Sequence, residues 1–135
     1  MSEIQILIQF KKALIQFFDE LIGCLPHEGN LVIIRIFLKD QIPINDIMNI
    51  FVTFLLPLKE TVISRNESFF IDNDELFQAF NVDHVNHFKT IWQSNRLDCD
   101  DRLCIWKWFD SFIFLTEKFI NIKENNEIQI VSDNV

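Results

Sequence analysis

The stretch that constrains the fold most strongly is residues 98–122, which read DCDDRLCIWKWFDSFIFLTEKFINI. At 100° per residue, the angular step of an α-helix, apolar side chains wrap more than half of its circumference. The polar side chains form one strip, made up of Asp100, Lys107, Asp110, Ser111, Glu117, Lys118 and Asn121. A helix that is apolar over so much of its surface needs neighbours on two or three sides. The pattern therefore predicts the central helix of a bundle.

Phe114 is the exception to this pattern. It lies inside the polar strip, four residues after Asp110 and four residues before Lys118, where the core of the same domain is not expected. Aromatic side chains are enriched at protein interfaces. We therefore expect a partner-binding edge formed by Phe114, Lys107, Asp110 and Lys118, although a single exposed hydrophobic residue is also ordinary.

The composition of the chain also favours helices. Its 135 residues fit one domain with a substantial core, and 49% of them are apolar. Two glycines and three prolines are too few for a sandwich or barrel, which needs a turn signal every ~8–12 residues. We predict an all-α, single-domain bundle of about five to six helices over residues 1–122, around the aromatic C-terminal helix. Residues 123–135 are polar, and we expect them to form a mobile tail.

Local signals mark several helix ends. Ser2 and Gln5 make a capping box at the start of the first helix. The aromatic helix has three acidic residues that can cap it or stabilise its dipole, namely Asp98, Asp100 and Asp101. A polar strip keeps its phase through Pro57, which predicts one kinked helix rather than two unrelated helices.

Residues 31–38, LVIIRIFL, are ambiguous, because β-branched residues in a short apolar run are typical of a buried strand. A strand needs partners, and the only other β-like run, residues 128–131, lies in the polar tail. We therefore favour a short buried helix with Arg35 and Lys39 at its exposed edge. Arg35 either extends its charge to solvent or anchors an acidic partner.

Residues 65–74, RNESFFIDND, are expected to form a loop. The loop carries Phe69 and Phe70, which are further candidates for a partner-binding surface. The alternative is that both rings fold back onto the core.

The charge of the chain limits the classes of partner. Its net charge is −8, from 12 basic and 20 acidic residues. A nucleic-acid-binding domain normally carries a basic stripe, which is missing from this sequence, so we expect no direct contact with nucleic acid or with an anionic membrane. No apolar run is long enough to span a bilayer, and the N-terminus lacks the basic region of a secretion signal. We expect an intracellular, non-secreted protein.

Few residues suggest catalysis or metal binding. The three cysteines do not describe a disulfide framework, and two of them are expected to pack as small hydrophobic residues. The possible zinc ligands are His84, His87, Cys99 and Cys104. Within one helix Cys99 and Cys104 are about 140° apart, so a shared zinc ion requires Cys99 to precede the helix. A nucleophilic cysteine needs a positioned base, and nothing marks one. We expect no enzyme activity, no cofactor and no small-molecule substrate.

Three stretches, residues 8–44, 87–92 and 105–119, together resemble a family of small helical proteins encoded by nucleocytoplasmic large DNA viruses of protists and algae. The resemblance implies a viral protein that is packaged in the virion or works in the viral factory in the host cytoplasm. It supplies no activity and no site residues.

These observations predict a non-enzymatic protein that binds other proteins or has a structural role, as a virion component or viral-factory adaptor. Its partner is another protein or a second copy of the same chain. One alternative is a nucleic-acid-associated factor in viral transcription or packaging that acts through a partner. The other is a zinc-stabilised module that uses the two histidines and two cysteines above.

Overall fold

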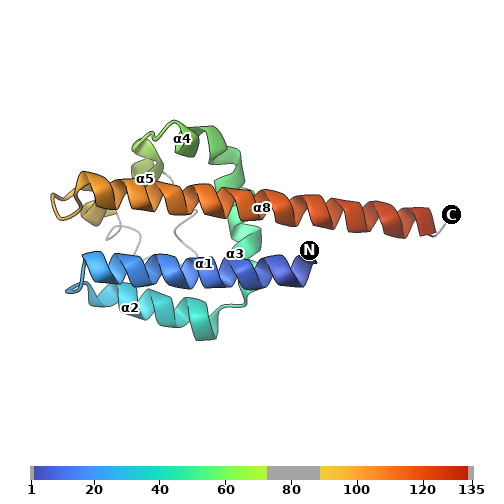
Figure 1. The fold of residues 1–135 in the computed structure, drawn as a ribbon, viewed down its shortest axis with the longest axis horizontal. Coiled ribbons are helices and arrows are strands. Elements are labelled where there is room, and N and C mark those ends of the chain that lie inside the picture. The colour runs from blue at the N-terminus through green and yellow to red at the C-terminus, as the bar shows by residue number, and fades with distance from the viewer. Residues whose placement is uncertain (1, 73–88, 134–135) are drawn as a thin grey trace.

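The computed structural model of the protein describes residues 2–72 and 89–133. These residues contain six α-helices, a further helical segment at 89–93, and no β-strand. They form a single all-α bundle, as the sequence predicted (Figure 1).

The bundle is built around two long antiparallel helices, α1 (Glu3–Cys24) and α8 (Cys99–Asp133), which lie side by side (Figure 1). Phe17 of α1 packs edge-on against Phe109 and Phe112 of α8, with ring centroids 5.8 and 5.6 Å apart. Phe51, from a third helical run, lies 5.7 Å from Phe112. Since α8 has neighbours on several sides, the prediction of a central aromatic helix is confirmed.

Both long helices begin at caps that the sequence predicted. The Ser2 hydroxyl accepts a hydrogen bond from the Gln5 N–H at 3.2 Å, and the Gln5 side chain accepts one from the Ser2 N–H at 2.8 Å. At the start of α8, the Asp98 carboxylate accepts from the Asp101 N–H at 2.7 Å, and the Asp101 carboxylate accepts from the Asp98 N–H at 3.2 Å. These bonds satisfy N–H groups that have no acceptor within their helix.

Residues 31–38 are helical, as we favoured from the sequence. The helix α2 (Gly29–Ile36) packs against α1 and continues as a π-helical turn, Phe37–Gln41. Its inner face is buried and consists of Leu31, Ile34 and Leu38. The prediction of a buried helix is wrong for the outer face, because α1 covers only one side of α2. The exposed residues of that face are Val32, Ile33, Ile36 and Phe37.

The predicted kinked helix is present as one helical run whose winding changes along its length. It comprises α3 (Ile44–Ile50), a π-helical segment (Phe51–Leu55), a 3-10 turn (Leu56–Leu58) and α4 (Lys59–Ile63). Pro57 has no N–H to donate, and its ring crowds the preceding turn, so regular α-helix is interrupted there. The run turns so that α4 lies on the side of α8 away from α1 (Figure 1).

The predicted loop over residues 65–74 is confirmed for residues 65–67 and wrong for residues 68–72, which are helical, while residues 73 and 74 lie outside the described part of the chain. The helix α4 ends at Ile63, and Arg65, in the turn that follows it, has a φ of 57°. The N–H groups of residues 65 and 66 donate back to carbonyls of the last turn at 3.0 and 3.1 Å. This is the Schellman arrangement, which usually takes glycine at the left-handed position. The chain then forms the short helix α5 (Ser68–Asp72).

The helix α8 is longer than predicted. It does not end near residue 122 but continues through residues 123–133. An established helix elongates without a new nucleation cost, and this segment has no glycine or proline to stop it. Asn126 donates a hydrogen bond to Glu3 at 3.3 Å, and α8 then projects past the start of α1 (Figure 1). The mobility expected for residues 123–135 stays a prediction.

Candidate functional site

Phe114 is exposed, as predicted, with 57% of its surface accessible. Of its predicted neighbours on the edge, Lys107 is also exposed, whereas Asp110 and Lys118 are half-buried. The Lys118 Nζ lies 4.8 Å from the centroid of the Phe114 ring. A cation over an aromatic face is attracted to it, so Lys118 covers part of the ring and leaves the rest to solvent.

Phe114 lines an open groove of about 280 Å³ between α4 and α8. We call it the Phe114 groove, and its lining consists of Lys59, Ile63, Arg65, Asp110, Ile113, Phe114 and Glu117. Ile63, the last residue of α4, is 53% exposed. The sequence pointed to Phe114 and Asp110 but not to the residues on the opposite wall, because no local pattern pairs α4 with α8.

Two ion pairs cross the Phe114 groove. Arg65 donates through two guanidinium nitrogens to the two carboxylate oxygens of Asp110, at 2.8 and 2.7 Å, which is a bidentate geometry. The Lys59 Nζ lies 2.6 Å from a carboxylate oxygen of Glu117. The hydrogen bond to Asp110 raises the pKa of Arg65, and the hydrogen bond to Glu117 raises the pKa of Lys59. Both cations are therefore charged at neutral pH, and the charges that line the groove balance.

Arg65 connects the Phe114 groove to the core. Besides pairing with Asp110, its guanidinium donates to the Val62 carbonyl at 3.2 Å and lies 5.7 Å from the centroid of a Trp106 ring. Left-handed backbone costs a non-glycine residue roughly 1 kcal/mol, and these contacts hold Arg65 in it. We did not predict Arg65, because Asp110 lies 45 residues away in the sequence. The local signal for it was the end of the polar strip at residue 64, which marks a helix end.

Phe69 and Phe70 do not belong to this surface, and their prediction as partner-binding residues is wrong. Phe69 is 0% exposed and Phe70 is 7% exposed. Phe70 stacks on Trp92 with centroids 4.0 Å apart, and Phe69 meets Phe109 edge-on at 5.1 Å. The alternative drawn from the sequence, in which both rings fold back onto the core, is the arrangement observed.

A second groove, of about 240 Å³, lies between the end of α1 and the start of α8. The Trp108 indole N–H donates to Glu20 at 2.5 Å, and the Cys24 thiol donates to Asp101 at 3.4 Å. Partial burial of the thiol, together with the neighbouring Asp101 carboxylate, raises the pKa of Cys24 to about 11. A nucleophilic cysteine requires a lowered pKa, so this groove does not activate Cys24.

The cysteines of the zinc alternative are not arranged as that alternative requires. Cys99 is the first residue of α8 rather than a residue before it, and Cys104 lies in the same helix. His84 and His87 lie outside the described residues. Across residues 2–72 and 89–133, no group of three or more His, Cys, Asp and Glu side chains is placed to hold a metal ion. All three cysteines are exposed, so the expectation that two of them pack in the core is wrong.

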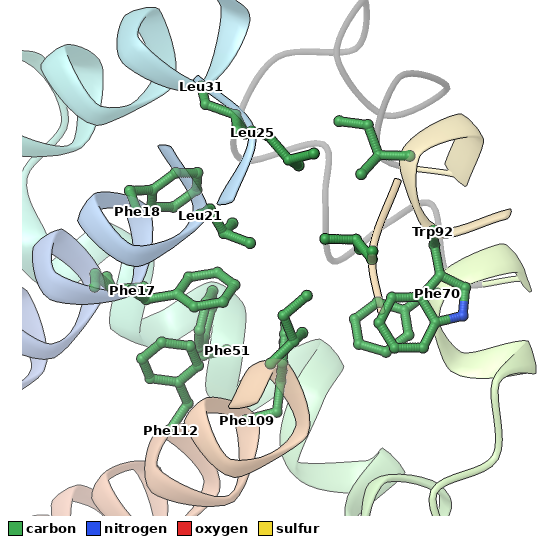
Figure 2. Close-up of a pocket in the computed structure, with 14 residues that line it drawn as sticks. Phe17, Phe18, Leu21, Leu25, Leu31, Phe51, Phe70, Trp92, Phe109 and Phe112 are labelled. Atoms are coloured by element: carbon green, nitrogen blue, oxygen red, sulfur yellow. The ribbon is translucent and has the colours of Figure 1, made fainter. Parts of the chain in front are cut away.

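A small apolar cavity of about 30 Å³ lies in the core, and Figure 2 shows the side chains around it. Phe17, Leu21 and Leu25 approach it from one side, and Phe70 and Trp92 lie on the opposite side. The indole nitrogen of Trp92 points away from the cavity (Figure 2). A substrate site needs a few polar groups that converge on the ligand, whereas the residues that line this cavity are all apolar. We therefore regard the cavity as a feature of core packing.

Comparisons with known proteins give no family assignment. No family model, curated protein or solved structure matches the chain. Among the described residues, no helix has both the length and the apolar content that crossing a bilayer requires.

Proposed function

We propose that the protein has a non-enzymatic binding or structural role, and that the Phe114 groove holds a segment of another protein. The observation that carries the proposal is the exposure of two large apolar side chains, Phe114 and Ile63, in one groove. An aromatic residue beside an aliphatic one, with charged residues around them, is the usual composition of a protein interface. The groove therefore has an apolar centre and a polar rim.

The charges of the groove define the chemistry of the partner. Arg65 and Lys59 are already paired with Asp110 and Glu117, so a strongly charged partner gains little electrostatic free energy by entering. An apolar side chain gains by covering Phe114 and Ile63. We expect an amphipathic segment that inserts an apolar side chain and leaves its polar face toward the ion pairs.

The two ion pairs also support the proposal because they help to order the groove before a partner binds. The bidentate pair of Arg65 with Asp110 joins the turn after α4 to α8, and the exposed pair of Lys59 with Glu117 adds a weaker link between α4 and α8. A surface that is ordered in advance loses less conformational entropy on binding. The side chains that contact the partner are then chiefly Phe114, Ile63 and the part of Lys118 that lies over the ring.

The proposal also states where the protein acts and what kind of partner it binds there. Residues 8–44, 87–92 and 105–119 resemble proteins of nucleocytoplasmic large DNA viruses, which supports a partner that is itself a viral protein, in the virion or in the viral factory. The net charge of −8 supports a protein partner over direct contact with the phosphate backbone of a nucleic acid.

The test compares the proteins that co-purify with the wild-type chain and with Phe114→Asp from the native setting. Phe114→Asp places a charge in the apolar centre and should lower recovery of the partner at least about tenfold, because loss of a hot spot costs more than ~1.4 kcal/mol. Circular dichroism of each purified variant shows that the substitution has not unfolded the bundle.

Ile8→Asp is the matched control, since Ile8 is 51% exposed and lies on α1, outside the groove. It should retain the partner that Phe114→Asp loses. If no co-purifying protein depends on Phe114 more than on Ile8, the proposal for this groove is wrong.

A further inference from the structure

The outer face of α2 is an apolar stripe of four residues, Val32, Ile33, Ile36 and Phe37, which are 40% to 49% exposed. We call it the α2 stripe. It lies opposite the inner face of the same helix, which is buried against the bundle. A helix that is apolar on all sides is normally enclosed on all sides. In Figure 1, α2 lies beyond α1 while α4 lies beyond α8, so the helix that carries the α2 stripe and the helix that forms one wall of the Phe114 groove are on opposite sides of the bundle.

We propose that the α2 stripe packs against the α2 stripe of a second copy of this chain, with the two helices antiparallel about a twofold axis. The register that centres the stripe places Val32 opposite Phe37 of the second copy, and Ile33 opposite Ile36 of the second copy. Each apolar side chain then meets another large apolar side chain. A twofold contact requires this kind of self-complementary surface.

The charges at the two ends of the stripe favour the antiparallel orientation. The same register places Asp40, an exposed acid just after the stripe, beside Gly29 at the start of α2 in the second copy. A helix N-terminus carries a positive partial charge, and the first turn of α2 contains no acidic residue of its own. A parallel pair would instead place the two Asp40 carboxylates next to each other, which is unfavourable.

The start of α2 is open to an incoming carboxylate. A Cβ atom added to Gly29 would meet nothing within 4 Å, so this end of the helix can be approached closely. The preceding residue, Glu28, makes no side-chain capping bond and pairs with Arg96 instead. Arg35, the basic residue of α2, is held 2.6 Å from Asp19 of α1 and does not add an unpaired charge to the contact.

The size of the stripe limits the strength of this dimer. Stable interfaces bury about 800 Å² on each partner. Four side chains that are 40% to 49% exposed, on one short helix, bury less than this area. We therefore expect a dimer that dissociates on dilution. The proposal is independent of the partner proposed for the Phe114 groove, and either can fail without the other.

Sedimentation velocity of the full chain over a concentration series tests the proposal. The wild-type protein should shift from monomer to dimer as its concentration rises. Ile36→Asp should raise the dissociation constant of the dimer at least about tenfold, because it buries a charge at the centre of the contact. Asp40→Lys, which changes an exposed side chain and cannot disturb the core, should weaken the dimer several-fold by placing a positive charge at the start of the second α2.

Ile63→Asp is the matched control, because Ile63 is 53% exposed and lies in the Phe114 groove. It should leave the dimer intact. The proposal is overturned if the wild-type protein is monomeric at every soluble concentration, or if a dimer persists unchanged in both Ile36→Asp and Asp40→Lys. A third outcome is that the wild-type protein is monomeric and binds neutral phosphatidylcholine vesicles, whereas the Ile36→Asp variant does not bind them. This outcome would assign the stripe to a lipid surface and would also overturn the proposal.

Discussion

Phe69 and Phe114 were both predicted to contact a partner, yet the first is 0% exposed and the second is 57% exposed. Phe69 lies in a short segment between polar residues, and Phe114 lies in the polar strip of a long helix. Arg65 connects the two regions. Its left-handed turn leads the chain into α5, which carries Phe69, and its guanidinium binds Asp110, which lies one helical turn before Phe114 on α8.

The comparison shows when local pattern decides the exposure of a side chain. On α8 the direction of every side chain follows from the helical step, so Phe114 must share the direction of Asp110 and Lys118. Phe69 has no such constraint, because the direction of a five-residue helix depends on the turn before it. That turn is stabilised in part by the pair of Arg65 with the distant Asp110, which no local pattern in the sequence indicates.

The largest expected effect is a contrast in stability between Phe69→Ala and Phe114→Ala. Phe69→Ala empties a fully buried site and should lower the free energy of unfolding by about 3–5 kcal/mol. Phe114→Ala removes an exposed ring and should change it by no more than about 0.5 kcal/mol. Urea unfolding followed by tryptophan fluorescence measures both values, and equal losses would contradict the different environments of the two rings.

A smaller effect is expected at Arg65. Arg65→Ala keeps the left-handed strain and loses the partly exposed pair with Asp110, which should cost about 1 kcal/mol. Arg65→Gly loses the same pair but removes the strain, so it should be more stable than Arg65→Ala by roughly 1 kcal/mol. Urea unfolding of both variants separates the energetic cost of the backbone strain from the contribution of the Arg65 side chain. An alanine variant as stable as the glycine variant would show that the turn is not strained.

The smallest effect is confined to alkaline pH, in the second groove beside α8. Alkylation of Cys24, followed by mass spectrometry, should rise with pH around a pKa of about 11, because burial and Asp101 favour the neutral thiol. In the unfolded chain the thiol should lose its proton at lower pH, near 9.0. The contribution of Cys24 to stability is therefore unchanged below about pH 9 and is lost as the pH rises toward 11.

Asp101→Asn should lower the pKa of Cys24, since it removes the carboxylate charge and keeps an oxygen that can accept at the helix start. A profile that does not move in this variant would mean that the end of α1 does not contact the start of α8 as described.

The parts of the fold that we predicted correctly lie within single helices. The cap at Ser2, the interruption at Pro57 and the exposure of Phe114 each follow from residues no more than a few positions apart. The parts that we missed join distant segments. The pair of Arg65 and Asp110, which forms one end of the candidate groove, is an example, because the two residues become neighbours only when α4 lies against α8.

The outer face of α2 and the end of α8 are two further features that we did not predict correctly from the sequence. Eight mostly apolar residues predicted a helix enclosed by the bundle, but whether a second neighbour reaches that helix depends on how the other elements pack. Loss of apolar periodicity after residue 122 predicted a helix end, but periodicity reports burial rather than helix elongation. The sequence thus specified which segments are helical and which way a side chain points on a long helix, since both depend on backbone geometry over a few residues. Only tertiary packing decided which apolar faces are covered and which charged residues meet, since both depend on contacts between segments far apart in the chain.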